Sequence, residues 1–193
     1  MRTHTLNIQD AEHTLEGLTV QSEAGEPPTY SEVLYRLYLP IGGSADVTVD
    51  GRKTTLGRLQ LLTQSPGEQV SFSPNAHLLS CAFHHNFFCV RVMRNEVFCD
   101  GVVFTRLRGL PIVDLREDGY PAALARFEEL SGILTGESLF KPEHAINTIK
   151  SLLLQAADCK IRHASPDESF QVTPAKVSEI VARFQDLVED NYA

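Results

Sequence analysis

Apolar and polar residues alternate in short runs between residues 33 and 72, and glycine or proline separates the runs. Alternation with a period of two predicts β-strands that bury one face. The runs are 33–39, 46–49, 54–56, 59–62 and 69–72. Asp50-Gly51 lies between the second and third runs, and both residue types accept the positive φ that a tight hairpin requires. The spacing predicts a small antiparallel barrel or sandwich.

More β-like segments flank this region. Residues 1–29 alternate weakly and predict one or two edge strands followed by a loop. Residues 77–85 predict a strand, and Asp100-Gly101 predicts another hairpin. Residues 87–93 fit either a short helix capped by the preceding asparagine or a continued strand. All of these segments belong to the same predicted β-region.

The pattern changes to a helical period after residue 118. Apolar stripes with i, i+3 and i+4 spacing predict helices over 121–134 and 142–160. Pro121 and Pro142 suit the first helical position, where the missing N–H is no loss. A third helix is predicted from Thr173 as the N-cap. Its stripe continues almost to the last residue, which fits either a helix cut from a longer chain or one that packs back on the barrel.

Composition narrows the functional classes. The 193 residues carry a formal net charge of -8 and a pI of about 5.3, which suits neither a phosphate backbone nor an anionic membrane surface. No apolar run is long enough for a secretory signal or a membrane helix. The four cysteines form no C-x-x-C pair. We therefore expect a cytoplasmic protein that binds no nucleic acid through this chain.

The sequence gives little indication of a metal-binding site or of a catalytic nucleophile. His77, His84 and His85 are the candidate ligands, but His84 and His85 point to opposite faces of a strand. Cys81 lies within a strand pattern rather than at a nucleophile elbow, so we expect it to pack in the core. We expect no metal, no cofactor and no catalytic residue.

Three segments resemble the N-terminal effector-binding and dimerisation domain of AraC-family transcriptional regulators. The first, 37–72, includes Val49-Asp50-Gly51 and the run from Gly57 to Gly67. The second combines Phe83 to Phe88 with Pro111 to Leu115. The third, 177–192, is similar to the segment that leads into the first DNA-binding helix of that family.

The resemblance implies an α+β chain with a cupin-like antiparallel β-barrel of the jelly-roll type, followed by a helical region. It implies a barrel at 1–118, a helical dimerisation pair at 119–165 and a linker with a helix at 166–193. The implied function is a homodimeric sensor that binds a small-molecule effector and controls transcription through an absent DNA-binding half. The alternative is a stand-alone cupin, either a metal-dependent enzyme or a sugar-binding module.

Candidate site residues follow from strand parity and from the helical stripes. The apolar residues on one face of each strand should line the barrel, and two arginines could anchor an acidic ligand. The candidate ligand-binding residues are Tyr35, Leu37, Leu39, Phe72, Phe83, Arg36 and Arg91. The second helix is apolar on more than one face, which indicates either a partner subunit or a third helix that covers this face. The candidate dimerisation residues are Ile146, Ile149, Leu153, Leu154, Ala157 and Ile161.

Overall fold

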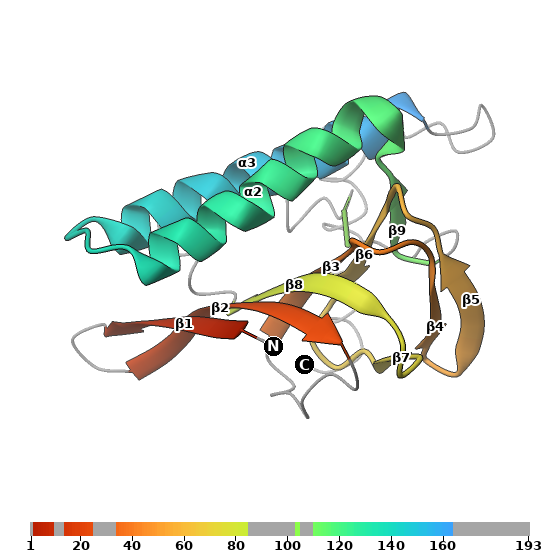
Figure 1. Cartoon of the computed structure of the whole chain (residues 1–193), viewed down its shortest axis with the longest axis horizontal. Coiled ribbons are helices and arrows are strands. Elements are labelled where there is room, and N and C mark those ends of the chain that lie inside the picture. Colours follow the sequence, from red (N-terminus) through yellow and green to blue (C-terminus); the bar gives the residue numbers. More distant parts are fainter. Residues whose placement is uncertain (1, 10–13, 25–33, 85–102, 105–109, 164–193) are drawn as a thin grey trace, which may run out of the picture. The chain divides into compact units, whose positions relative to one another are not determined.

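Two antiparallel β-sheets and two long α-helices form the part of the chain that the computed structural model describes (Figure 1). The described residues are 2–9, 14–24, 34–84, 103–104 and 110–163. Residues Met1–His163 form one compact unit and Ala164–Ala193 a second, so every described element belongs to the first unit. The domain boundaries at residues 118 and 165 stay predictions.

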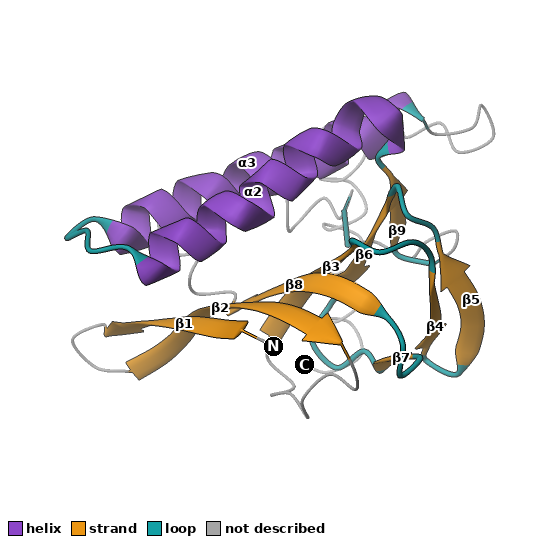
Figure 2. Ribbon diagram, in the orientation of Figure 1, coloured by secondary structure: helices purple, strands orange, loops and turns teal. Residues whose placement is uncertain are grey.

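The strands and helices follow one another in the predicted order (Figure 2). The strands are β1 Arg2–Gln9, β2 Thr14–Ala24, β3 Leu34–Pro40, β4 Ala45–Val49, β5 Arg52–Leu56, β6 Gln60–Gln64, β7 Val70–Phe72, β8 His77–His84 and β9 Ile112–Asp114. The helices are α2 Arg116–Thr135 and α3 Lys141–Arg162. None of the helices within the described ranges combines the length and apolar content that crossing a bilayer requires.

Long-range antiparallel pairing builds the sheets. The larger sheet has the order β1-β2-β8-β3-β6-β9, and the smaller one has the order β5-β4-β7. Leu37 of β3 lies opposite Cys81 of β8 on one side and Thr63 of β6 on the other. The predicted α+β class is confirmed, because two facing antiparallel sheets precede the two helices.

The turn between β4 and β5 confirms the hairpin predicted at Asp50-Gly51. Asp50 has a φ of 46° and Gly51 a φ of 78°, the left-handed pair that a two-residue hairpin loop requires. Asp50 also accepts a hydrogen bond at 2.8 Å, through Oδ1, from the backbone N–H of Gln69. This contact joins the turn to the segment that enters β7.

Helix α2 begins earlier than predicted. Arg116 is its first residue, so Pro121 lies inside the helix and its prediction as the first helical position is wrong. The helix begins here because Asp114 and Leu115, the two residues before it, already form hydrogen bonds with its first turn. The N–H of Gly119 donates to the carbonyl of Leu115 at 3.1 Å, and Asp114 Oδ1 accepts from the N–H of Arg116 at 3.1 Å. Pro142, by contrast, lies in the first turn of α3 as predicted.

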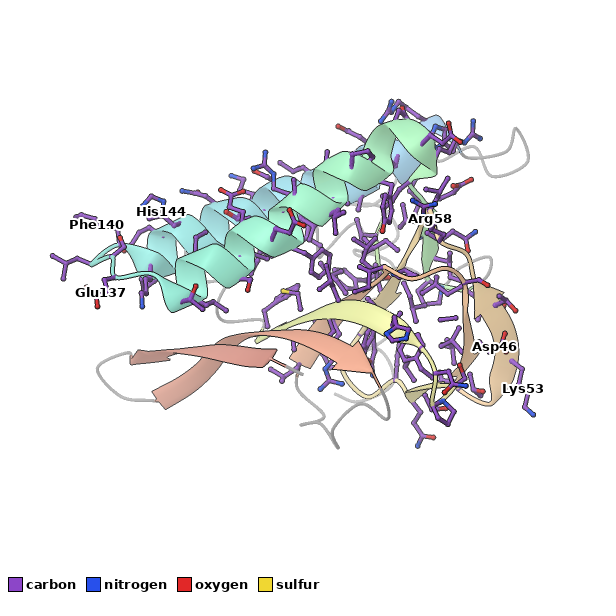
Figure 3. All side chains as sticks on the ribbon, viewed as in Figure 1. Asp46, Lys53, Arg58, Glu137, Phe140 and His144 are labelled. Atoms are coloured by element: carbon purple, nitrogen blue, oxygen red, sulfur yellow. The ribbon has the colours of Figure 1, made fainter. Side chains whose placement is uncertain are left out.

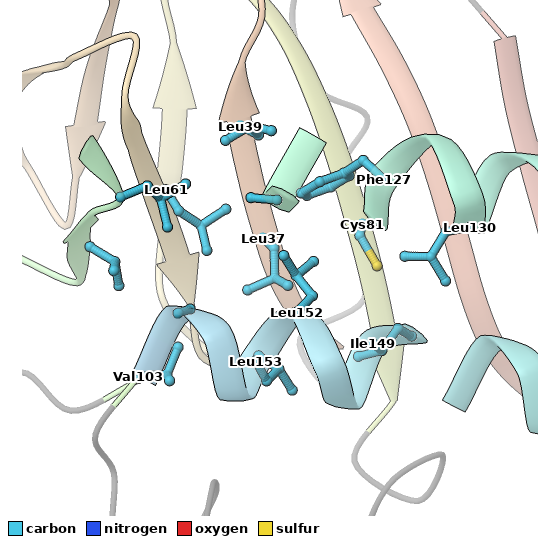
Figure 4. Close-up of a cluster of buried hydrophobic side chains, with 14 of the residues drawn as sticks. Leu37, Leu39, Leu61, Cys81, Val103, Phe127, Leu130, Ile149, Leu152 and Leu153 are labelled. Atoms are coloured by element: carbon cyan, nitrogen blue, oxygen red, sulfur yellow. The ribbon is translucent and has the colours of Figure 1, made fainter. Parts of the chain in front are cut away.

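Strands β3, β6 and β8 of the larger sheet are buried on both faces. One face packs against α2 and α3. The hydrophobic cluster between this face and the two helices includes Leu37, Cys81, Phe127 and Leu152 (Figure 4). The other face lies opposite the smaller sheet. The cluster between the two sheets includes Tyr38, Val47, Val49, Leu56, Leu62, Phe72 and Leu78. Strand β3 is therefore buried at five consecutive positions rather than at alternate ones.

This double burial corrects the parity assignment of the barrel interior. Tyr35, Leu37, Leu39 and Phe83 belong to the cluster that faces the helices, not to the space between the sheets. Tyr35 stacks on Phe83 with ring centroids 5.9 Å apart. Phe72 does face the space between the sheets. Parity separates the two faces of a strand, but it does not say which layer covers each face.

Three predicted elements lie outside the described residues. They are the third helix from Thr173, the alternative helix or strand at 87–93, and the hairpin at Asp100-Gly101.

Candidate functional site

Four polar side chains lie on the face of the larger sheet that meets the smaller one. They come from three neighbouring strands, and we call them the inner polar group: Arg36, Tyr38, Gln64 and Ser80. Their exposed fractions are 3%, 1%, 7% and 4%. Arg36 lies opposite Gln64 in the pairing of β3 with β6, and Tyr38 lies opposite Ser80 in the pairing of β3 with β8. The sheet register therefore holds the four residues together.

Gln64 joins the inner polar group by hydrogen bonds. Its Oε1 accepts from Tyr38 Oη at 2.7 Å and from Arg36 Nη1 at 3.5 Å. Its Nε2 donates to the backbone carbonyl of Glu68 at 2.7 Å. The Glu68 carboxylate in turn accepts from the N–H of Ser65 at 2.8 Å. The buried arginine is thereby connected to the turn between β6 and β7.

This arrangement concentrates polar chemistry in an interior that is otherwise apolar. Burying a guanidinium away from water is costly, so such a group needs compensating interactions. Arginine also presents a planar fork of N–H donors that matches a carboxylate in two parallel hydrogen bonds. The apolar remainder of the interior is filled by its own side chains, including Leu56, Leu62 and Phe72. The polar side chains of the described interior are thus confined to one end.

Among the described residues, the face of the smaller sheet that meets the larger one does not fit the metal site that metal-dependent cupins carry. The residues of β4 that face the larger sheet are Ala45, Val47 and Val49, and the corresponding residue of β7 is Phe72. None of these side chains offers a nitrogen, oxygen or sulfur atom to a metal ion. Within the described ranges, no three His, Cys, Asp or Glu side chains lie close enough together to bind one ion.

The other chemical candidates occupy different places. His77 is exposed at the start of β8, and His85 lies outside the described residues. Cys81 is fully buried in the cluster beneath the helices, as expected of a packing residue. Burial raises the pKa of its thiol, so the nucleophilic thiolate is disfavoured.

Only one predicted ligand-binding arginine can be placed. Arg36 lies in the inner polar group, whereas Arg91 lies outside the described residues. Tyr38, Gln64 and Ser80 were not predicted from the sequence. A signal for Tyr38 was present, because it shares its strand parity with Arg36. Gln64 and Ser80 gave no signal, since their places depend on long-range pairing.

The predicted dimerisation residues divide between the core and the surface of α3. Ile149 and Leu153 are fully buried against the sheet, so they are core residues and are not available to a partner. Ile146 and Ala157 are partly buried. Leu154 is 41% exposed and Ile161 is 50% exposed. Leu154, Ala157 and Ile161 follow one another at i, i+3 and i+7, and we call them the α3 stripe.

No protein-family model matches this sequence, and no curated protein matches it. Among solved structures, the chain is similar to a cupin protein from Bacteroides fragilis, with a TM-score of 0.33 and 18% identity over 43% of this chain and 79% of that chain. It is similar to the Clostridium difficile EutQ protein, with a TM-score of 0.29 and 19% identity over 42% of this chain and 62% of that chain. It is also similar to the cupin domain of Schizosaccharomyces pombe Cnp3, with a TM-score of 0.30 and 13% identity over 45% of this chain and 67% of that chain. The described part of the chain is an α+β fold in which two antiparallel sheets precede two helices.

Proposed function

We propose that this chain is the ligand-sensing and dimerisation domain of an AraC-type transcriptional regulator. It binds a small-molecule effector, performs no catalysis and acts in the cytoplasm as a homodimer. It reaches DNA only through a helix-turn-helix domain that follows it. The resemblance of residues 177–192 to the segment that leads into such a domain supports the last step.

The observation that carries the proposal is the inner polar group. A buried guanidinium at 3% exposure, hydrogen-bonded to Gln64, gives the interior a cationic end. An acidic small molecule suits that end, because the planar fork of an arginine binds a carboxylate in two parallel hydrogen bonds. The effector that the site supports best is therefore a small carboxylic acid. The α3 stripe supports dimerisation, since apolar side chains at helical spacing gain by removal from water.

A thermal-shift screen with small carboxylic acids tests the ligand step. A ligand that binds only the folded state adds about 2.7 kcal/mol at a hundred times its dissociation constant. That increment raises Tm by roughly 5–10 °C in a chain of this size. The Arg36→Lys variant keeps the charge but loses the planar fork, so it should lose most of the shift.

Arg52→Lys is the matched control, because Arg52 is exposed on β5. Its shift should equal that of the unaltered protein. The proposal fails if no acid shifts Tm, or if Arg36→Lys and Arg52→Lys respond alike.

The alternative is a stand-alone cupin, either a metal-dependent enzyme or a sugar-binding module. Elemental analysis after gentle purification separates the first form from the regulator. Stoichiometric iron, zinc or manganese would favour the enzyme. The reading frame gives a second test, because a basic helix-turn-helix segment encoded after residue 193 would favour the regulator.

A further inference from the structure

The smaller sheet carries a groove on the face that points away from the larger sheet. The groove has a volume of about 510 Å³. Its lining includes the polar side chains of Asp46, Thr48, Lys53, Thr55, Ser71 and Ser73. Figure 3 shows Asp46 and Lys53 on the neighbouring strands β4 and β5.

Strand register brings these side chains onto one face. Thr48 of the central strand lies opposite Lys53 on one side and Ser71 on the other. Asp46, two residues earlier on the same strand, lies opposite Thr55. The alternate positions of β4 are the buried alanine and valines of the core. The hydroxyl and charged groups are therefore fixed on the outer surface by the same alternation that fills the interior.

The chemistry of the lining selects the ligand. Asp46 Oδ1 accepts a hydrogen bond at 2.9 Å from Thr55 Oγ1, which orients the carboxylate on the sheet. A carboxylate has acceptor capacity for several further donors, the Lys53 ammonium has three donors, and each hydroxyl both donates and accepts. One negative and one positive group give the lining no net charge. An anion would meet the Asp46 carboxylate, and a cation would meet the Lys53 ammonium.

We infer that this groove binds a neutral polyhydroxylated molecule of the size of a monosaccharide or disaccharide. Hydroxyl groups of such a ligand pair with both the acceptors and the donors of the lining. The volume lies within the usual range of small-molecule sites. No aromatic side chain lies exposed in the described lining, so the affinity rests on hydrogen bonds. This site is separate from the inner polar group, which lies on the other side of β4 and β7.

Amide chemical-shift mapping by NMR tests the inference on the whole 193-residue chain. The probes are maltose, galactose and sorbitol as neutral ligands, with gluconate as the anionic comparison and glucosamine as the cationic one. We expect saturable shifts from a neutral ligand that are confined to 46–55 and 71–73. Asp46→Asn should weaken this binding about tenfold, because it removes a charged acceptor.

Thr48→Val removes a hydroxyl without a change of shape and gives a second readout if Asp46→Asn does not fold. It should also weaken binding, whereas Thr135→Val, at an exposed threonine of α2, should leave binding unchanged. Three results would each overturn the inference. They are no shifts with any neutral probe, equal binding by Thr48→Val and Thr135→Val, and tighter binding of gluconate or glucosamine than of every neutral probe.

Discussion

The α3 stripe makes the sharpest prediction of the proposed function. Leu154 and Ile161 are 41% and 50% exposed on the outer surface of a helix whose opposite side is buried in the core. Replacing both by lysine, in the variant Leu154→Lys/Ile161→Lys, should leave the fold intact because neither side chain contributes to the buried cluster. The same change should abolish the homodimer, since it puts charges into the proposed interface.

The magnitude follows from the exposed fractions. Fully burying a leucine or isoleucine side chain contributes about 1.5–3 kcal/mol. Each of the two side chains has about half of its surface left to bury, so each contributes about 1 kcal/mol. A two-fold axis repeats both contacts, which gives about 4 kcal/mol from four side chains. The dissociation constant should therefore rise on the order of a thousandfold in the double variant.

Sedimentation equilibrium over a range of micromolar concentrations measures this effect. Ile41→Lys is the matched control, because Ile41 is also 41% exposed but lies on the turn after β3 rather than on a helix. The control should dimerise like the unaltered protein. The reasoning is refuted if the unaltered chain is a monomer at tens of micromolar, or if Ile41→Lys weakens the dimer as much as the double variant does.

Three further predictions concern stability. Phe127→Ala should lower the free energy of unfolding by about 3–5 kcal/mol in urea titrations, whereas Phe140→Ala, at a side chain that is 65% exposed, should change it by less than about 0.5 kcal/mol. Gly119→Ala should destabilise the fold, because a Cβ there would lie 3.0 Å from the sulfur of Cys159. In a Cys159→Ala background that sulfur is gone, so Gly119→Ala should instead stabilise the helix by about 1 kcal/mol, the difference in helix propensity between glycine and alanine. Burial raises the pKa of the Cys81 thiol above its ordinary 9.0, so above about pH 9 only the unfolded chain ionises there and stability should fall by about 1.4 kcal/mol per pH unit; Cys81→Val should show a correspondingly shallower decline in pH-dependent urea titrations.

Local signals in the sequence predicted the elements well. The Asp50-Gly51 turn and the position of Pro142 were both read correctly, because φ preferences and the missing proline N–H act within a few residues. The start of α2 was misplaced, because Pro121 suits a first turn but does not exclude a helix that has begun earlier. The competing signal was the acidic pair Glu117 and Asp118, which lies in the observed first turn.

The candidate site depended on information that periodicity does not contain. Leu37 and Tyr38 are adjacent and both almost fully buried, yet they belong to different clusters. A strand buried on two sides loses the contrast between apolar and polar positions, so its pattern cannot assign the layers. Gln64 could not be recognised as the centre of the polar group either, since its partner Tyr38 is 26 residues away in sequence.

The double burial of β3 also suggests how the proposed sensor would pass on its signal. Arg36 and Tyr38 face the interior, and Leu37 between them contributes to the cluster that α2 and α3 cover. Thr63, next to Gln64, donates to the carbonyl of Pro111 at 3.2 Å, just before the strand that leads into α2. A ligand that moved the inner polar group would therefore also move the backbone of β3 and β6, against which the helices pack. Under the proposed function, ligand binding and dimerisation are then thermodynamically linked. Each must change the affinity of the other by the same factor.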